Sequence, residues 1–175
     1  SLEDYLPDIT GNVHLEAHLE GPVSRLEGQG SLKGDHLDLM GQPLEKMSLD
    51  MELKDNRLHM LSSQAALETG RVVNGSGWIG FDGSYSIDLH TTGLQLNSIA
   101  SIQEMKSVNG KVDFHLRGDG NVKNPSIFGD LYAREVLVNN QKMDDFDFQI
   151  NLAQNQLTME GHQTFELELA YHLLN

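Results

Sequence analysis

The chain has 175 residues, of which 38% are hydrophobic and 6% are aromatic, and its net charge at pH 7 is −14. This length and apolar content suffice for one ordinary domain or a stretch of an elongated array, whereas the acidic balance argues against nucleic-acid binding. We expect no membrane span or signal peptide in this segment, because no window approaches about 18 uncharged apolar residues. The absence of cysteine slightly favours an oxidising compartment such as the periplasm.

Apolar and polar residues alternate with a period of two along most of the chain, as in strands that are buried on one face. The first such strand covers residues 13–19. Residues 47–53 show the same pattern, and Asp55-Asn56 then leads into apolar residues 58 and 60, which predicts a β-hairpin. The glycines between residues 21 and 34 indicate bulges or close approach of neighbouring strands.

A second hairpin is predicted around Asp82-Gly83. A two-residue turn would place polar residues opposite apolar ones on the same face. We therefore predict a three-residue loop, which pairs Phe81 with Tyr85 and Ile79 with Ile87.

One short helix is predicted from about Asn97 to Met105. Asn97 or Ser98 is a suitable N-cap, and Ile99 and Ile102 would share a face. Strand-like alternation then continues to the end of the chain, so the predicted fold is all-β. The residues predicted to share its apolar face are Val13, Leu15, Leu19, Met47, Leu49, Met51, Leu53, Ile79, Phe81, Tyr85, Ile87, Leu89, Val112, Phe114, Leu116, Phe146, Phe148, Ile150, Leu152, Phe165, Leu167 and Leu169.

The sequence also repeats itself at an offset of about 99 residues. Gly11 matches Gly110, and the alternating residues 47–53 match residues 146–152. We therefore expect a single segment over residues 1–175, with one repeat over about 11–109 and a second, truncated repeat over about 110–175 of a longer protein.

The chain shows no pattern that predicts catalysis or metal binding. His14 and His18 share a strand face but lie roughly 13 Å apart, which is too far for both to ligate one ion. We find no nucleophile elbow, phosphate loop or His-Glu metal motif. The sequence therefore predicts a protein that is not an enzyme, with no metal site and no cofactor.

The second repeat opens with a glycine-initiated strand from Gly110 to Leu116, followed by Gly120, Pro125 and the Gly129-Asp130-Leu131 triplet. The short segment from Leu96 to Met105 precedes it. This arrangement resembles the TamB and AsmA-like family of Gram-negative envelope proteins, most closely the repeated β region of TamB, over nearly the whole chain. The resemblance implies an elongated sheet, curved like a taco around an apolar groove lined by the residues above.

The resemblance also implies a location and a function. The segment would lie in the periplasm as part of an inner-membrane-anchored protein, and would conduct phospholipids between the two membranes as their acyl chains ride in the groove. A TamA-like outer-membrane barrel would be a partner through regions outside this segment. Two alternatives stay open: a scaffold or chaperone for outer-membrane β-barrel proteins and autotransporters that offers a strand edge or the apolar face, and a closed β-sandwich that serves as a structural module.

Overall fold

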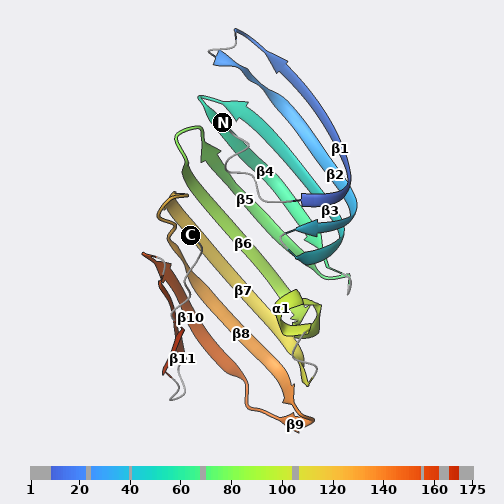
Figure 1. Cartoon of the computed structure of the whole chain (residues 1–175), viewed down its shortest axis with the longest axis vertical. Helices are drawn as coiled ribbons and strands as arrows, with labels where there is room; N and C mark the ends of the chain where they lie inside the picture. Colours follow the sequence, from blue (N-terminus) through green and yellow to red (C-terminus); the bar gives the residue numbers. More distant parts are fainter. Residues whose placement is uncertain are drawn as a thin grey trace.

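The computed structural model describes residues 9–22, 25–39, 41–67, 70–103, 107–154, 156–161 and 166–169. Its twelve strands form one antiparallel sheet in which each strand lies beside its neighbour in the sequence, except that the short β9 pairs only with β8 (Figure 1). The prediction of an all-β fold is confirmed. The strands are β1 (Ile9–Glu20), β2 (Glu27–Leu39), β3 (Gln42–Lys54), β4 (Arg57–Ala66), β5 (Val72–Gly80), β6 (Ser84–Gln95), β7 (Val108–Asn121), β8 (Ile127–Val138), β9 (Gln141–Lys142), β10 (Phe146–Ala153), β11 (Gln156–Gly161) and β12 (Glu166–Leu169).

The hairpin predicted at Asp55-Asn56 is confirmed. Lys54 pairs with Arg57, so these two residues form the whole connection between β3 and β4. Both have a positive φ, 51° for Asp55 and 58° for Asn56. Two successive residues in this region are the signature of a type I′ turn, whose twist matches that of the flanking strands.

The register predicted for the β5–β6 hairpin is wrong by two residues. Ile79 pairs with Tyr85, not with Ile87, and Phe81 lies in the connecting loop. The loop has the predicted three residues but begins one residue earlier. This placement puts Gly83 third in the loop, where its φ of 82° is accommodated without a side-chain clash. A shift of two residues keeps Ile79 and Tyr85 on the predicted face.

The predicted helical segment is divided in two. The 3-10 helix η3 (Leu96–Ser98) and the single-turn α1 (Ala100–Gln103) flank Ile99, whose φ of −84° and ψ of 120° are extended. The Ser98 hydroxyl donates to the carbonyl oxygen of Gln95 at 2.7 Å and does not cap a helix. Met105, the predicted end, lies outside the described residues.

Close strand approach explains part of the glycine content, as predicted. A Cβ at Gly28 would lie 2.0 Å from the carbonyl oxygen of His18, and one at Gly129 would lie 2.0 Å from that of His115. No side chain fits at that distance. These two glycines therefore allow β2 to approach β1 and β8 to approach β7.

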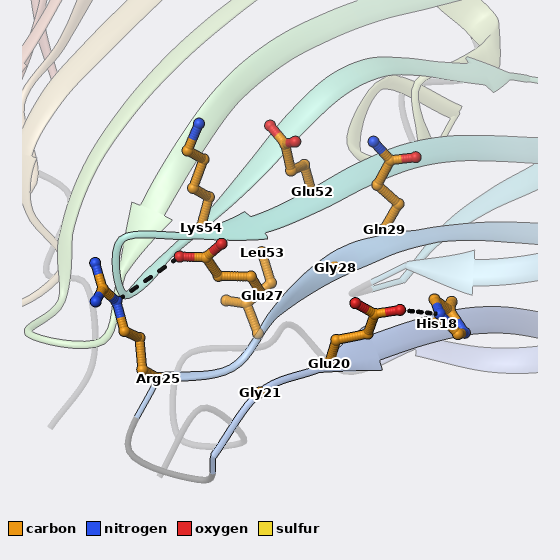
Figure 2. A pocket seen from close by; sticks show the side chains of 10 residues that line it. All are labelled: His18, Glu20, Gly21, Arg25, Glu27, Gly28, Gln29, Glu52, Leu53 and Lys54. Atoms are coloured by element: carbon orange, nitrogen blue, oxygen red, sulfur yellow. Dashed lines mark hydrogen bonds and ion pairs between the residues drawn. The ribbon is translucent and has the colours of Figure 1, made fainter.

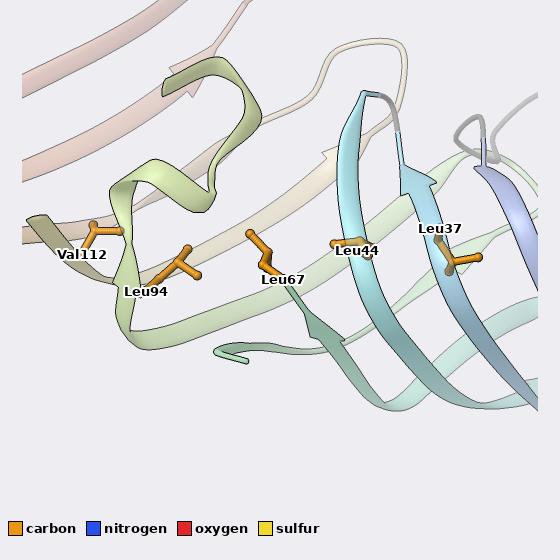
Figure 3. Packing of buried hydrophobic residues seen from close by; sticks show 5 residues of the cluster. All are labelled: Leu37, Leu44, Leu67, Leu94 and Val112. Atoms are coloured by element: carbon orange, nitrogen blue, oxygen red, sulfur yellow. The ribbon is translucent and has the colours of Figure 1, made fainter. Parts of the chain in front are cut away.

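The buried core of this single sheet lies toward one end of the strands. Five side chains form it, and each is 4% exposed or less. Figure 3 shows them following one another from β7 to β2, with the strands curving away beneath them. We call this cluster the filled part of the apolar face: Leu37, Leu44, Leu67, Leu94 and Val112.

Candidate functional site: the apolar face of the sheet

The strand ladders join apolar residues into rows that cross the sheet. Residues that pair directly in an antiparallel sheet point to the same face. Among the first strands, Leu15 of β1 pairs with Leu32 of β2, which pairs in turn with Leu49 of β3. Further along the same face, Leu89 of β6 pairs with Leu116 of β7. Because each row continues across successive strands, the sheet has one continuous apolar face.

The predicted apolar residues come together on this face with few exceptions. Phe81 lies in the β5–β6 loop and is 50% exposed. Phe165 lies outside the described residues. For Leu167 and Leu169 the structure gives the backbone register, in which they pair with Met159 and Leu157. The ladders place on one face Val13, Leu15, Leu19, Met47, Leu49, Met51, Leu53, Ile79, Tyr85, Ile87, Leu89, Val112, Phe114, Leu116, Phe146, Phe148, Ile150 and Leu152.

Two of these residues are buried by the protein itself. Val112 is 1% exposed and belongs to the filled part. Tyr85 is 8% exposed, and its hydroxyl donates to the carbonyl oxygen of Ser126 at 3.0 Å and accepts from the Ser126 N–H at 2.9 Å. These side chains therefore stabilise the fold and present little surface to a guest molecule.

The opposite end of the central strands has no second layer over it in the part of the chain that the structure describes. There Leu53 of β3 pairs with Leu58 of β4, which pairs with Ile79 of β5. All three side chains are half-buried, and every strand that the structure describes belongs to the same sheet, so no second sheet packs on them. We call Leu53, Leu58 and Ile79 the open part of the apolar face.

Sequence reasoning missed several members of this face on β2. Leu32 lies on it, but the alternation of β2 is concealed because Gly28, Gly30 and Gly34 occupy three further positions of the same face. If these glycines are counted as positions of the apolar face, the period-two alternation of β2 becomes visible and includes Leu32. The filled-part residues Leu37 and Leu44 were missed for a different reason. They pair with each other but lie out of phase with Gly34 and Met47, next to the positive φ of 51° at His36, so strict alternation assigns them to the wrong face.

The other face of the sheet is polar, and its ion pairs lie near solvent. The His115 imidazole contacts the Asp88 carboxylate at 2.9 Å, and this hydrogen bond outweighs partial burial to lower the pKa of Asp88. Burial raises the pKa of Asp113, but hydrogen bonds from the Gly93 N–H and from Arg134 outweigh it and lower the pKa overall. A lowered pKa keeps both carboxylates anionic at neutral pH, whereas a carboxyl group that acts as a general acid at that pH needs a raised pKa.

A hollow on this polar face lies beside the β1–β2 connection (Figure 2). Its side chains carry both signs of charge. Arg25 contacts Glu27 at 3.9 Å, and His18 contacts Glu20 at 2.9 Å, with all four side chains at least half exposed. Among the described residues no group of three or more His, Asp or Glu side chains is arranged to hold a metal ion. The hollow is a solvated surface of exposed ion pairs.

Trp78 also lies on the polar face, where the Arg57 guanidinium stacks 4.2 Å from its ring centroid. Such cation–π stacking explains the aromatic side chain as local packing.

No family model, no curated protein and no solved structure matches this chain. Its function must therefore be argued from geometry. No helix in the described part of the chain is long and apolar enough to span a membrane.

Proposed function

We propose that this chain is a segment of a hydrophobic groove that conducts phospholipids across the periplasm between the inner and outer membranes, and that it is not an enzyme. The observation that carries the proposal is the continuous apolar face of a single sheet, over whose open part the described residues place no second sheet. A contiguous apolar surface that the protein leaves accessible is typical of a site that binds a partner or a ligand.

The free energy of transfer supports such a route. Burying a methylene group contributes about 0.8 kcal/mol, so a sixteen-carbon chain gains on the order of 12 kcal/mol relative to water. A bilayer provides a similar gain, and transfer from the membrane to the groove is therefore close to neutral. The groove lowers the barrier that a bare hydrocarbon chain faces in water, and this role requires no catalytic residue.

The ladder registers support a groove built from repeats of about 99 residues. Leu15 pairs with Leu32, and the residues 99 positions later, Phe114 and Leu131, also pair. Residues with a positive φ follow the same offset, with 51° at His36 and 53° at Glu135. Repeated units of this kind would extend one apolar face into a long, taco-like groove.

The resemblance to the TamB and AsmA-like family supplies the cellular setting of the proposal. It places the segment in the periplasm, within an inner-membrane-anchored protein that acts in envelope biogenesis. The direct partners would be phospholipid acyl chains, and a TamA-like outer-membrane barrel would interact through other regions of the protein.

Site-specific photo-crosslinking tests the conduit. A benzophenone side chain at Leu49 or Ile150 should capture lipid, because both residues lie on the apolar face. The neighbouring Ser48 and Gln149 point to the polar face and serve as controls. In cells, Leu49→Asp or Phe148→Asp should abolish phospholipid flux. Equal capture at apolar and polar positions, or normal flux with both charges present, would rule the conduit out.

One observation favours a second candidate, a scaffold for the assembly of outer-membrane β-barrel proteins. β1 is twelve residues long and, among the described strands, pairs only with β2; its Val13, Leu15 and Leu19 are between 45% and 58% exposed. A client strand could add to this edge by β-augmentation. In that case the benzophenone at Leu49 should capture polypeptide, not lipid. A closed sandwich needs two packed sheets, whereas the described strands form one.

A further inference from the structure

The helical segment lies over strands that are not its neighbours in the sheet. η3 and α1 connect β6 to β7, which are adjacent and could be joined by a short turn. Instead the segment is bonded to Gln42 of β3. Three inter-strand spacings separate β3 from β6, or roughly 14 Å. The segment therefore reaches back across the ends of β4 and β5.

The Gln42 side-chain amide holds this arrangement through both of its polar atoms. Its Nε2 donates to the carbonyl oxygen of Ser98 at 3.0 Å, and its Oε1 accepts from the Ala100 N–H at 2.9 Å. Nε2 also donates to the carbonyl oxygen of Pro43 at 3.0 Å. A single side chain thus satisfies backbone groups on both sides of Ile99, at the break between the two helices.

The clamped segment covers the filled part of the apolar face. Leu96 and Ile99 pack against its five buried residues. Ser98 is only 3% exposed, and its hydroxyl is satisfied by the Gln95 carbonyl. A hydrocarbon chain has no vacant surface to contact there, since the protein's own side chains occupy it. At the other end of β3 to β5, the side chains of the open part are half-buried, and no described helix lies over them.

We infer that acyl chains are excluded from the filled part of the apolar face and reach the open part, and that Gln42 is the positioning residue that keeps η3 and α1 on the filled part. The inference rests on the proposed function and makes it more specific: at the β3–β5 strands, hydrocarbon contacts Leu53, Leu58 and Ile79, and the helical segment marks where the accessible apolar face ends.

Thiol labelling tests the boundary without any lipid, and the chain has no native cysteine to interfere. A cysteine in place of Leu53 should react readily with a maleimide, and one in place of Leu44 should be protected. Gln42→Ala removes two hydrogen bonds that hold the segment, so it should speed labelling at position 44 by about tenfold or more. Equal labelling at the two positions in the otherwise unchanged chain would overturn the boundary.

Gln64→Ala is the matched control, because Gln64 also donates an amide hydrogen bond, to Asn74 Oδ1 at 3.3 Å, but lies away from the segment. It should leave labelling at position 44 unchanged. A core cysteine could impair folding, so hydrogen exchange of the Ala100 N–H provides a second readout in a chain with an intact core. Gln42→Ala should accelerate this exchange, and an unchanged rate would show that Gln42 does not position the segment.

Lipid capture tests the site itself. Benzophenone is placed at Leu53 or Leu44, and the protein is mixed with vesicles of phosphatidylethanolamine and phosphatidylglycerol. We expect lipid adducts at position 53, and at position 44 only after Gln42→Ala. Adducts at both positions in the unaltered chain would overturn the boundary and leave the conduit standing. Adducts at neither position would overturn the conduit and the acyl-chain site with it, and thiol labelling would still decide the role of Gln42.

Discussion

The two ends of β3 carry similar residues in different surroundings. Leu44, near the start of the strand, is 4% exposed, whereas Leu53, near its end, is half-buried. Both are leucines followed by a charged residue, and both lie on the apolar face. The difference is the covering provided by η3 and α1. In a protein made of one sheet, a strand's own sequence determines which face is apolar, and a distant segment determines how much of that face is closed.

The largest expected effect is a loss of stability confined to the filled part. Leu94→Ala should reduce the free energy of unfolding by about 2–5 kcal/mol, because Leu94 is 2% exposed and its removal leaves a cavity. Leu53→Ala, in the open part, should cost about 1 kcal/mol, because less surface returns to water. Urea denaturation of both variants measures the contrast. Equal losses would mean that the two parts are packed alike.

Substitutions of two glycines of β2 test the same comparison, with a smaller expected loss of stability. A Cβ at Gly34 would lie 2.6 Å from Cδ1 of the buried Leu37, so Gly34→Ala should overpack the filled part and cost about 1–3 kcal/mol. At Gly30 the nearest atom would be the Glu16 carbonyl oxygen at 3.0 Å, followed by Ala17 Cβ at 3.4 Å. Gly30→Ala should therefore change stability by only about 0.5 kcal/mol. Thermal unfolding measures the stability of both variants. A larger loss for Gly30→Ala than for Gly34→Ala would contradict the assignment of Gly34 to the tightly packed filled part.

A smaller effect than that of Gly34→Ala is expected at the β-bulge between Thr91 and Leu94 of β6, just before the chain enters η3. The Gly93 N–H donates to Asp113, which also accepts from Arg134 at 2.6 Å. These contacts lower the pKa of Asp113 below its ordinary value of 3.8, so their stabilisation is present above about pH 3.8 and is lost as the pH falls through the lowered pKa. Asp113→Asn should reduce the free energy of unfolding by about 1 kcal/mol at pH 7, and the variant should lose less stability than the unaltered chain as the pH falls below about 3.8.

The control for this variant is Asp88→Asn. The Asp88 side chain is 39% exposed, and its ion pair with His115 is screened by solvent, so its loss should cost less than that of Asp113. Unfolding curves between pH 2 and pH 7 for both variants make the comparison, and an equal or larger loss for Asp88→Asn would contradict it.

The sequence predicted most strand faces well because side-chain direction has a period of two wherever a strand is regular. That rule holds even where the pairing was predicted wrongly: the shift in the β5–β6 register still leaves Ile79 and Tyr85 on one face. The rule fails where glycines replace the apolar residues, as in β2, because a missing side chain carries no pattern. The local conformation of Gly83 fixed a register that hydrophobic pairing alone misplaced.

The division between the filled and open parts could not be predicted in this way. The alternation places Leu44 out of phase with Leu53, so it gives no indication that both lie on the apolar face. A glutamine at position 42 is an ordinary strand residue until Ser98 and Ala100 are brought to it. The helix itself was predicted only approximately, because the extended backbone at Ile99 interrupts it. Contacts between distant segments decide these features, and the alternation of neighbouring residues contains no information on them.

The strand order has a consequence for how the chain folds. Strands β1 to β8 follow one another in the sheet in the order of the sequence, so the sheet can grow one hairpin at a time. The Gln42 clamp is an exception, since it joins groups 56 and 58 positions apart and must wait until η3 and α1 have arrived. The hydrophobic surface of β2 to β5 is therefore exposed during early folding, and closing one end of it is a late event.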